Sequence, residues 1–267
     1  MQPVLHAEQA LVRVVHFYGS TPAFVLLGGL VPQMLCSAAA MPHAGTSDID
    51  VQVDLEIASD SVGARRLEAA LQAAGFEPDG EVWRWQTTTS HGTRAVVQFE
   101  LLADQEDLPA GRVLTFDDCA HLGAANVRGT GYAARDTSER ELTAEVDGIA
   151  RTVRVRVTGL AGFLLAKVGA AKSRSKPRDW YDIAYVLLHN DAQVDGAEAV
   201  LLAFGPVPEA RTALRDLQAN FDDHACQGTS AYVRQVTLDD PDLDPAEAGA
   251  DALLAVTAFC STLLETS

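Results

Sequence analysis

Two aspartates separated by one residue have the types and spacing of a metal site. Asp48 and Asp50 flank Ile49 in a stretch that alternates polar and apolar residues, the pattern of a half-buried strand. Residues two apart in a strand point to the same face, so both carboxylates enter one small volume. Two ionised carboxylates at that separation repel unless a cation lies between them, and their hard oxygens suit Mg²⁺ shared with substrate phosphates. The solvent face of an edge strand would show the same spacing and is the alternative.

A diglycine precedes the aspartates. Gly28 and Gly29 follow an apolar run at 23–27 and come before a stretch with helical character at 32–40. Without side chains at these two positions, backbone N–H groups can approach a phosphate closely. A plain glycine turn between a strand and a helix is the alternative. In this order, the diglycine and the aspartate pair predict a phosphate cradle beside a metal site.

The order of strand, diglycine and Asp-x-Asp resembles the nucleotidyltransferase superfamily. The run from Thr46 through Ser47 to Val51 is similar to the T-x-D-I-D form of that motif. The resemblance implies a polymerase-β-like core in which Thr46 and Ser47 contribute to nucleotide binding. It also implies a third metal-binding carboxylate on a neighbouring strand. Glu100, a lone acid in the apolar stretch 97–102, is the candidate, although an outward-facing glutamate would give the same pattern.

A second block lies in the C-terminal half. Lys167 and Arg174 are seven residues apart, so they share one face of a helix, while Asp179 and Asp182 are adjacent on the next helix. This block resembles the C-terminal signature of AbiEii-type nucleotidyltransferases, in which an R-D-x-x-D box, here beginning at Arg178, follows a helical lysine and an arginine. The resemblance implies that the lysine and arginines bind triphosphate. The aspartates either hold these cations or contact the nucleotide or acceptor. A purely structural salt-bridged helix pair is the alternative.

Together the two blocks predict an enzyme that binds two Mg²⁺ ions and moves a nucleoside monophosphate from a nucleoside triphosphate to an acceptor hydroxyl. The candidate residues fall into three overlapping groups. The catalytic candidates are Asp48, Asp50, Lys167 and Asp179; the metal ligands are Asp48, Asp50 and Glu100; and the nucleotide-binding candidates are Gly28, Gly29, Thr46, Ser47, Lys167, Arg174, Arg178 and Asp182.

The acceptor follows from the resemblance alone. It implies a toxin of a type IV toxin–antitoxin or phage-defence system, with the 3′ end of tRNA as acceptor and a cognate antitoxin encoded by a neighbouring gene. A small hydroxylated molecule, as in antibiotic nucleotidyltransferases, is one alternative. A non-catalytic module that keeps nucleotide binding is another.

Charge bears on the choice of acceptor. The chain carries a formal net charge of −17, which argues against a protein that simply coats nucleic acid. Residues 151–178 are an exception, because they carry +8 and leave −25 on the rest of the chain. Such a basic island can focus anionic ligands, including an RNA acceptor stem, although solvated faces of a strand and a helix would look the same.

The helices and strands expected from the sequence, which must position these residues, indicate an α/β (α+β) fold with a mixed sheet. We expect a nucleotidyltransferase core domain over 1–158 and a mainly helical domain over 159–267. The four cysteines lack metal-site spacing, and no signal peptide or membrane-spanning stretch is evident, so we expect a cytoplasmic protein without membrane contact. The expected strands are 23–27, 47–55, 82–88 and 94–102, with a hairpin over 141–157; the expected helices are 4–17, 32–40, 62–74, 160–173, 180–189 and 253–264, the last preceded by a solvated acidic loop at 239–251.

Overall fold

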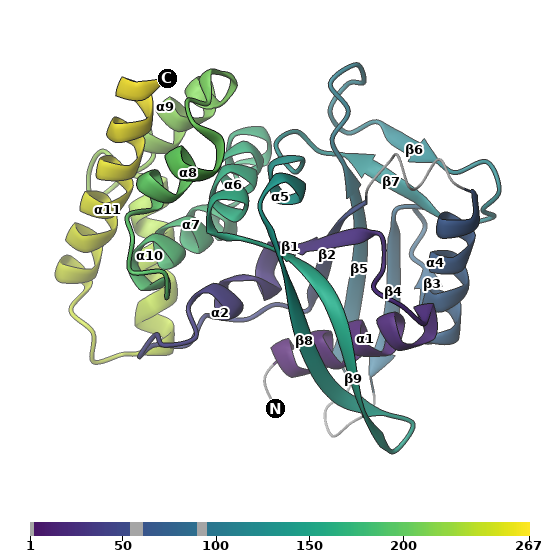
Figure 1. The fold of residues 1–267 in the computed structure, drawn as a ribbon. Coiled ribbons are helices and arrows are strands. Elements are labelled where there is room, and N and C mark those ends of the chain that lie inside the picture. Colours follow the sequence, from purple (N-terminus) through teal and green to yellow (C-terminus); the bar gives the residue numbers. More distant parts are fainter. Residues whose placement is uncertain (1–2, 54–60, 90–94) are drawn as a thin grey trace. The chain divides into compact units, whose positions relative to one another are not determined.

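The computed structural model describes residues 3–53, 61–89 and 95–267, drawn as a ribbon in Figure 1. The chain divides into two compact units. Unit 1 comprises Met1–Val31 and Gly45–Thr158, and unit 2 comprises Pro32–Ala44 and Gly159–Ser267. The main division therefore falls after Thr158. The segment 32–44, which the sequence analysis placed in the first domain, belongs to unit 2.

Unit 1 is built on a mixed sheet, to which the described residues contribute nine strands. The main path runs β3-β4-β5-β2-β1-β9-β8, and β7 pairs with both β5 and β6. Strand β2 is parallel to β5 and antiparallel to β1, while β1 is parallel to β9. The strands are β1 (Phe24–Leu27), β2 (Asp48–Val53), β3 (Glu77–Pro78), β4 (Arg84–Thr89), β5 (Ala95–Ala103), β6 (Val113–Thr115), β7 (Gly123–Asn126), β8 (Thr137–Val146) and β9 (Ile149–Thr158).

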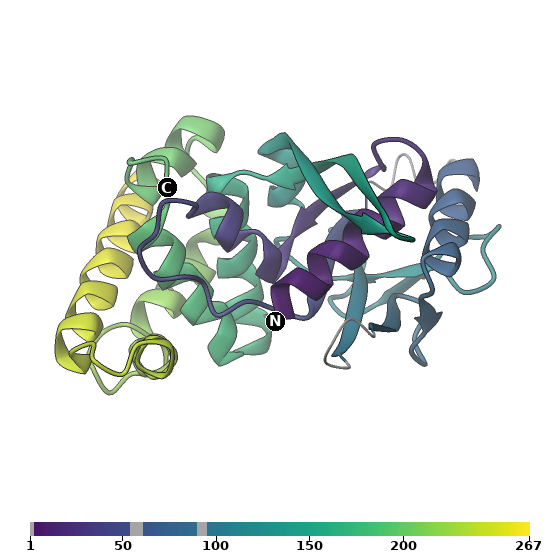
Figure 2. The ribbon, with the colours of Figure 1, turned by 90° about the horizontal axis from the view of Figure 1, so that it is seen from below.

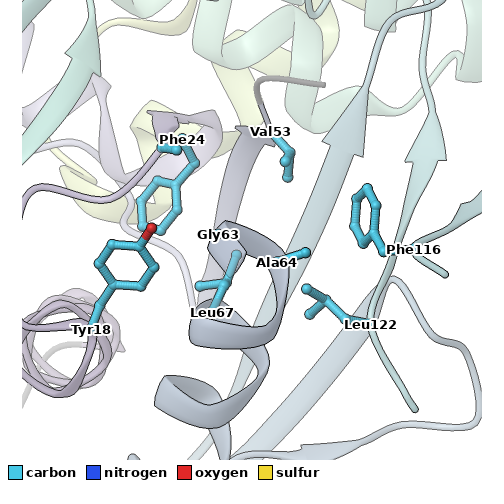
Figure 3. Close-up of a pocket in the computed structure, with 9 residues that line it drawn as sticks. Tyr18, Phe24, Val53, Gly63, Ala64, Leu67, Phe116 and Leu122 are labelled. Atoms are coloured by element: carbon cyan, nitrogen blue, oxygen red, sulfur yellow. The ribbon is translucent and has the colours of Figure 1, made fainter. Parts of the chain in front are cut away.

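Helices α1 (Pro3–Tyr18) and α4 (Ser61–Ala73) pack on one face of the sheet of unit 1. Helix α1 contacts α4 and the strands β5, β8 and β9, and Figure 2 shows it lying along the sheet. Figure 3 shows Phe24 and Val53 of the sheet facing Leu67 of α4. The gap lined by these side chains has a volume of about 20 Å³, room for about one water molecule, so it is a packing defect of the core and too small for a ligand.

The register shows which face of the sheet is left for polar residues. Phe24 pairs with Val53 across β1 and β2, and Leu27 pairs with Asp50. Because side chains alternate along a strand, Ile49 and Val51 share the helix-covered face with Val53, whereas Asp50 shares the opposite face with Leu27. Only part of that opposite face is apolar. Its small cluster is made of Val25, Leu27, Leu102, Ala125 and Ala133, the last from the short helix α5 (Tyr132–Arg135).

Unit 2 is helical. Helix α7 is its centre, because it contacts α6, α10 and α11 and buries Trp180, Tyr181 and Tyr185. Its start is favoured by Pro177 in the first turn, where the missing N–H has no intrahelical partner to lose. The helices are α2 (Pro32–Leu35), α6 (Leu160–Arg174), α7 (Pro177–His189), α8 (Gly196–Phe204), α9 (Arg211–Ala219), α10 (Gln227–Asp239) and α11 (Pro245–Thr266).

Helix α11 is, by length and composition alone, long and apolar enough to cross a membrane. In the structure it packs against α7, α8, α9 and α10. Its buried residues recur at helical spacing and include Ala252, Val256, Phe259 and Leu263, while Leu254 is exposed. This is the pattern of a helix that contributes one face to a protein core.

The sequence correctly predicts a mixed α/β fold with a mixed sheet, but several boundaries are wrong. The expected helix at 32–40 ends at Leu35, because the Asp191 carboxylate accepts the backbone N–H groups of Ser37 (2.6 Å) and Ala38 (2.8 Å). The acidic stretch at 239–251 is only partly a loop. Helix α11 already begins at Pro245, since the Asp244 side chain caps it by accepting the Ala246 N–H at 2.8 Å. The strand ends expected at 54–55 and 94 lie outside the described residues.

Candidate functional site

The aspartate pair lies on an inner strand of the unit 1 sheet. Asp48 and Asp50 are half-buried on one face of β2, while Ile49 between them is fully buried on the other. The hydroxyl of Thr46 accepts the backbone N–H of Asp48 at 3.0 Å, and the Ser47 hydroxyl lies 3.3 Å from the Asp48 carboxylate. Thr46 and Ser47 therefore fix the start of the strand that presents both carboxylates.

The diglycine packs directly on this strand. Gly28 has a φ of +78°, and a Cβ added to it would lie 2.6 Å from Cγ of Asp50. A Cβ on Gly29 would lie 2.7 Å from Cβ of Thr46. Both distances are shorter than van der Waals contact, so only glycine fits at either position with these neighbours in place. The structure thus brings together Gly28, Gly29, Thr46 and Asp50. Both glycines are buried, and their phosphate-cradling role stays a prediction.

Glu100 shares the face of the aspartates but already has a partner. It lies opposite Asp50 in the parallel pairing of β2 with β5, so both side chains project from the same face. Its Oε1 accepts a hydrogen bond from Nε of Arg84 at 2.9 Å, and the Arg84 guanidinium also stacks over the Trp83 ring, 4.4 Å from its centroid. Arg84 is absent from the sequence-based site; its position opposite Glu100 on β4 depends on strand pairing that spacing alone does not reveal.

These carboxylates differ in how well they fit Mg²⁺. Asp48 and Asp50 project from one face of β2 and supply hard oxygen donors, which suit an ion that shares its remaining ligands with phosphate and water. Within the described residues, no group of three or more His, Cys, Asp or Glu side chains is arranged to hold a metal ion. Glu100 can join the pair only by exchanging its Arg84 contact. The aspartate pair therefore fits the ion, whereas Glu100 as third ligand stays a prediction.

The second block forms a buried ionic cluster in unit 2. Lys167 lies on α6, and its side chain is 9% exposed. Its Nζ donates to Asp179 at 3.0 Å and to Asp182 at 2.7 Å, both on α7. The aspartate side chains are 1% and 0% exposed. Lys167 therefore joins the two helices by bridging both carboxylates of the R-D-x-x-D box.

Three further side chains complete the cluster. Arg174 binds both oxygens of Asp179 through Nε and Nη2, each at 2.7 Å, which is the forked geometry of a strong charge-assisted pair. Asp182 accepts from Nε of Arg178 at 3.1 Å and from Nε2 of His43 at 2.9 Å. The arginine side chains are 39% and 37% exposed, so each reaches the surface from a buried carboxylate. Of the two roles expected for the aspartates, the structure shows that they hold the cations.

The charge state of the aspartates follows from these contacts. Burial raises the pKa of Asp182, but Lys167, His43 and Arg178 outweigh it and bring the pKa below its ordinary value. Burial also raises the pKa of Asp179, and Lys167 with Arg174 lowers it below the ordinary value. Both carboxylates are therefore ionised at neutral pH, as a cluster of paired cations requires.

His43 is a cluster residue that sequence reasoning missed, because a loop histidine is usually exposed. Its side chain is 1% exposed and stacks on the Tyr181 ring with centroids 5.1 Å apart. The loop is anchored on both sides, since the Tyr181 hydroxyl accepts the Ala44 N–H at 3.0 Å and the Tyr185 hydroxyl donates to the Met41 carbonyl at 2.7 Å. The sequence did contain one signal, because Tyr181 and Tyr185 are four residues apart and so form an aromatic face on one helix. Tyr181 is thus a packing residue, and a base cannot stack on it without displacing His43.

No model of a known protein family matches this chain, and no curated protein matches it significantly. The site is therefore defined by its own geometry. Unit 1 supplies paired carboxylates, a glycine turn against them and a third carboxylate held by arginine. Unit 2 supplies a buried lysine and two partly exposed arginines fixed by two aspartates. The first set offers carboxylate oxygens of the kind that bind hard cations, and the second presents positive charge at a protein surface.

Proposed function

We propose that this chain is a magnesium-dependent nucleotidyltransferase with a polymerase-β-like core in unit 1. One observation carries the proposal: Asp48 and Asp50 project from the same face of β2 while Gly28 packs against Asp50. Glycine lets the turn after β1 approach Asp50 closely, so backbone N–H groups of that turn lie beside the carboxylate pair that would share a metal ion with phosphate.

The reaction proposed is transfer of a nucleoside monophosphate. A bond forms between an acceptor hydroxyl oxygen and the α-phosphorus, the bond from that phosphorus to the bridging oxygen breaks, pyrophosphate leaves, and the hydroxyl proton passes to water. When bound, Mg²⁺ supplies Lewis acidity at the phosphate oxygens. Asp48 and Asp50 would hold the ions, with Glu100 as the third ligand. Thr46 fixes the backbone at Asp48, so that both carboxylates keep their orientation.

In unit 2, we assign phosphate neutralisation to Arg174 and Arg178, the cations of the cluster whose side chains are more than a third exposed. Lys167 is a positioning residue in this proposal. Its ammonium bridges Asp179 and Asp182, which in turn fix the two guanidinium groups. Preorganised cations of this kind can bind phosphate without having to reorient.

Two acceptors remain in competition. The motif resemblance favours the 3′ end of tRNA, and with it a toxin role and an antitoxin partner. The net charge of −17 favours a small hydroxylated acceptor, because an RNA chain would be repelled by most of the protein. Salt separates the two, since an RNA acceptor requires phosphate contacts whose strength falls steeply with added salt.

The decisive experiment measures label transfer from each of the four α-labelled nucleoside triphosphates. Total tRNA and a panel of small hydroxylated molecules serve as acceptors, with and without Mg²⁺. The matched control is the Asp48→Asn/Asp50→Asn variant, which keeps side-chain size and removes the metal-binding charge. Transfer that needs Mg²⁺ and disappears in the variant supports the proposal. Transfer that survives in the variant would refute it, as would the absence of transfer to every acceptor.

A further inference from the structure

A groove of about 590 Å³ is lined by α7 and α10, entirely within unit 2. One wall includes Lys176 and Arg178 at the start of α7, and the other includes Arg234 on α10. The two helices pack closely, and the rings of Tyr181 and Tyr232 stack across them with centroids 6.1 Å apart. The groove therefore has walls fixed by core packing, and its volume lies in the range of small-ligand sites.

The groove is positively charged. Lys176, Arg178 and Arg234 line it, and no carboxylate is among its described lining residues. Lys176 and Arg234 are exposed, and neither makes an ion pair within the part of the chain that the structure describes. Arg178 also pairs with Asp182, with 3.1 Å between Nε and Oδ1. Without these three cations the chain would carry −20, so the groove concentrates positive charge in an acidic protein.

Polar groups of α10 complement the charge. Gln227, Ser230 and Gln235 line the groove, and amides and hydroxyls can both donate to and accept from a ribose or a base. The Gln235 amide also donates to Asp239 at 3.2 Å, which fixes its orientation. On the α7 wall, the buried Nε1 of Trp180 has no acceptor among the described residues, an unusual state for a buried donor.

We propose that this groove binds the phosphate chain of a free nucleoside di- or triphosphate without magnesium. Three cations offset the charge of such a ligand, so a metal ion is not needed for neutralisation. A long RNA is disfavoured, because its phosphates would extend beyond the groove into the field of a chain that is otherwise at −20. The inference goes beyond the proposed function, since it adds a nucleotide site that does not depend on the aspartate pair, although Arg178 is common to both proposals.

The test is calorimetric titration of the full chain with ATP in the presence of EDTA. We expect saturable binding that the Asp48→Asn/Asp50→Asn variant retains. Arg234→Gln should weaken it by about ten-fold or more, as expected for loss of a charged hydrogen bond, and Lys176→Gln/Arg234→Gln should abolish it. The matched control is Arg215→Gln, which removes an exposed arginine of the same unit outside the groove. Adenosine, which lacks phosphate, should not bind.

Three results would overturn the inference. ATP could fail to bind in EDTA, or Arg234→Gln could bind it as well as Arg215→Gln does. A short labelled oligoribonucleotide could bind more tightly than ATP and lose that affinity in Arg234→Gln, which would make the groove an RNA site. Failure of the proposed function is seen separately, as absence of Mg²⁺-dependent label transfer while ATP binding in EDTA persists. Circular dichroism melts confirm that each variant is folded.

Discussion

Gly28, the residue after β1, is in direct contact with Asp50 of β2, so that a Cβ on the glycine would overlap the carboxylate. The glycine is also held at a φ of +78°, a conformation that other residues rarely adopt. Two independent constraints thus require glycine at position 28. One is local backbone geometry, and the other is the space occupied by the side chain proposed to bind the metal.

These two constraints can be separated by substitution. Gly28→Ala should abolish label transfer and lower the free energy of unfolding by about 1–2 kcal/mol from the backbone alone, with a further cost from the contact with Asp50. Gly111→Ala is the matched control, because Gly111 has the same φ of +78° with no atom within 4 Å of the added Cβ. Urea denaturation of Gly111→Ala should show only the loss of unfolding free energy that comes from the backbone conformation, and this variant should keep its label-transfer activity. Equal losses of label-transfer activity in Gly28→Ala and Gly111→Ala would show that Gly28 has no specific role in the site.

Glu100 and Arg84 give a second prediction, about the third carboxylate. If Glu100 joins the metal site, Glu100→Gln should raise the Mg²⁺ concentration needed for half-maximal transfer by about ten-fold, since a charged ligand becomes neutral. Arg84→Gln breaks the same ion pair but leaves the carboxylate, so its Mg²⁺ requirement should be unchanged or lower. The measurement is transfer rate against Mg²⁺ concentration. Parallel shifts in both variants would mean that the ion pair, and not metal binding, is the role of Glu100.

The sequence predicts local features well where one pattern decides the structure. Alternation around Asp48 gives β2 and the common face of its carboxylates, and the Asp147-Gly148 turn gives the hairpin of β8 and β9. Contacts between distant residues cannot be read in this way. His43 lies 139 positions from Asp182 in sequence. The helix at 32–35 ends because the Asp191 carboxylate, 154 positions beyond Ser37, accepts a hydrogen bond from the Ser37 N–H group.

The aspartates of the ionic cluster should make stability depend on acid pH. Burial raises the pKa values of Asp179 and Asp182, but neighbouring cations lower them below the ordinary value. A carboxylate with a depressed pKa in the folded state stabilises the fold above its unfolded pKa of about 4, and this contribution is lost as pH falls through the folded pKa. The free energy of unfolding should therefore decline below about pH 5, as measured by urea denaturation at a series of pH values.

The contribution of one carboxylate can be isolated by comparing slopes. Asp182→Asn should be less stable than the unmodified chain at pH 7 and should lose less stability on acidification, because the group that binds the extra proton on unfolding is gone. Glu141→Gln is the control, since Glu141 pairs with Arg154 on the surface and both side chains are more than 60% exposed. Its pH slope should match that of the unmodified chain. If Asp182→Asn kept the full slope, the cluster would not be the origin of the acid sensitivity.

Lys167 should be the most costly cation to remove. Lys167→Met keeps much of the side-chain volume but leaves two buried carboxylates without the ammonium that bridges them. Breaking a buried pair from one side costs about 3–5 kcal/mol, and we expect the lower end because Arg174 and Arg178 still contact the aspartates. Lys172→Met, on the same helix, removes an ion pair to Asp216 whose lysine side chain is 45% exposed, and should cost at most about 1 kcal/mol. Urea denaturation at pH 7 measures both, and similar costs in the two variants would show that Lys167 does not hold the cluster together.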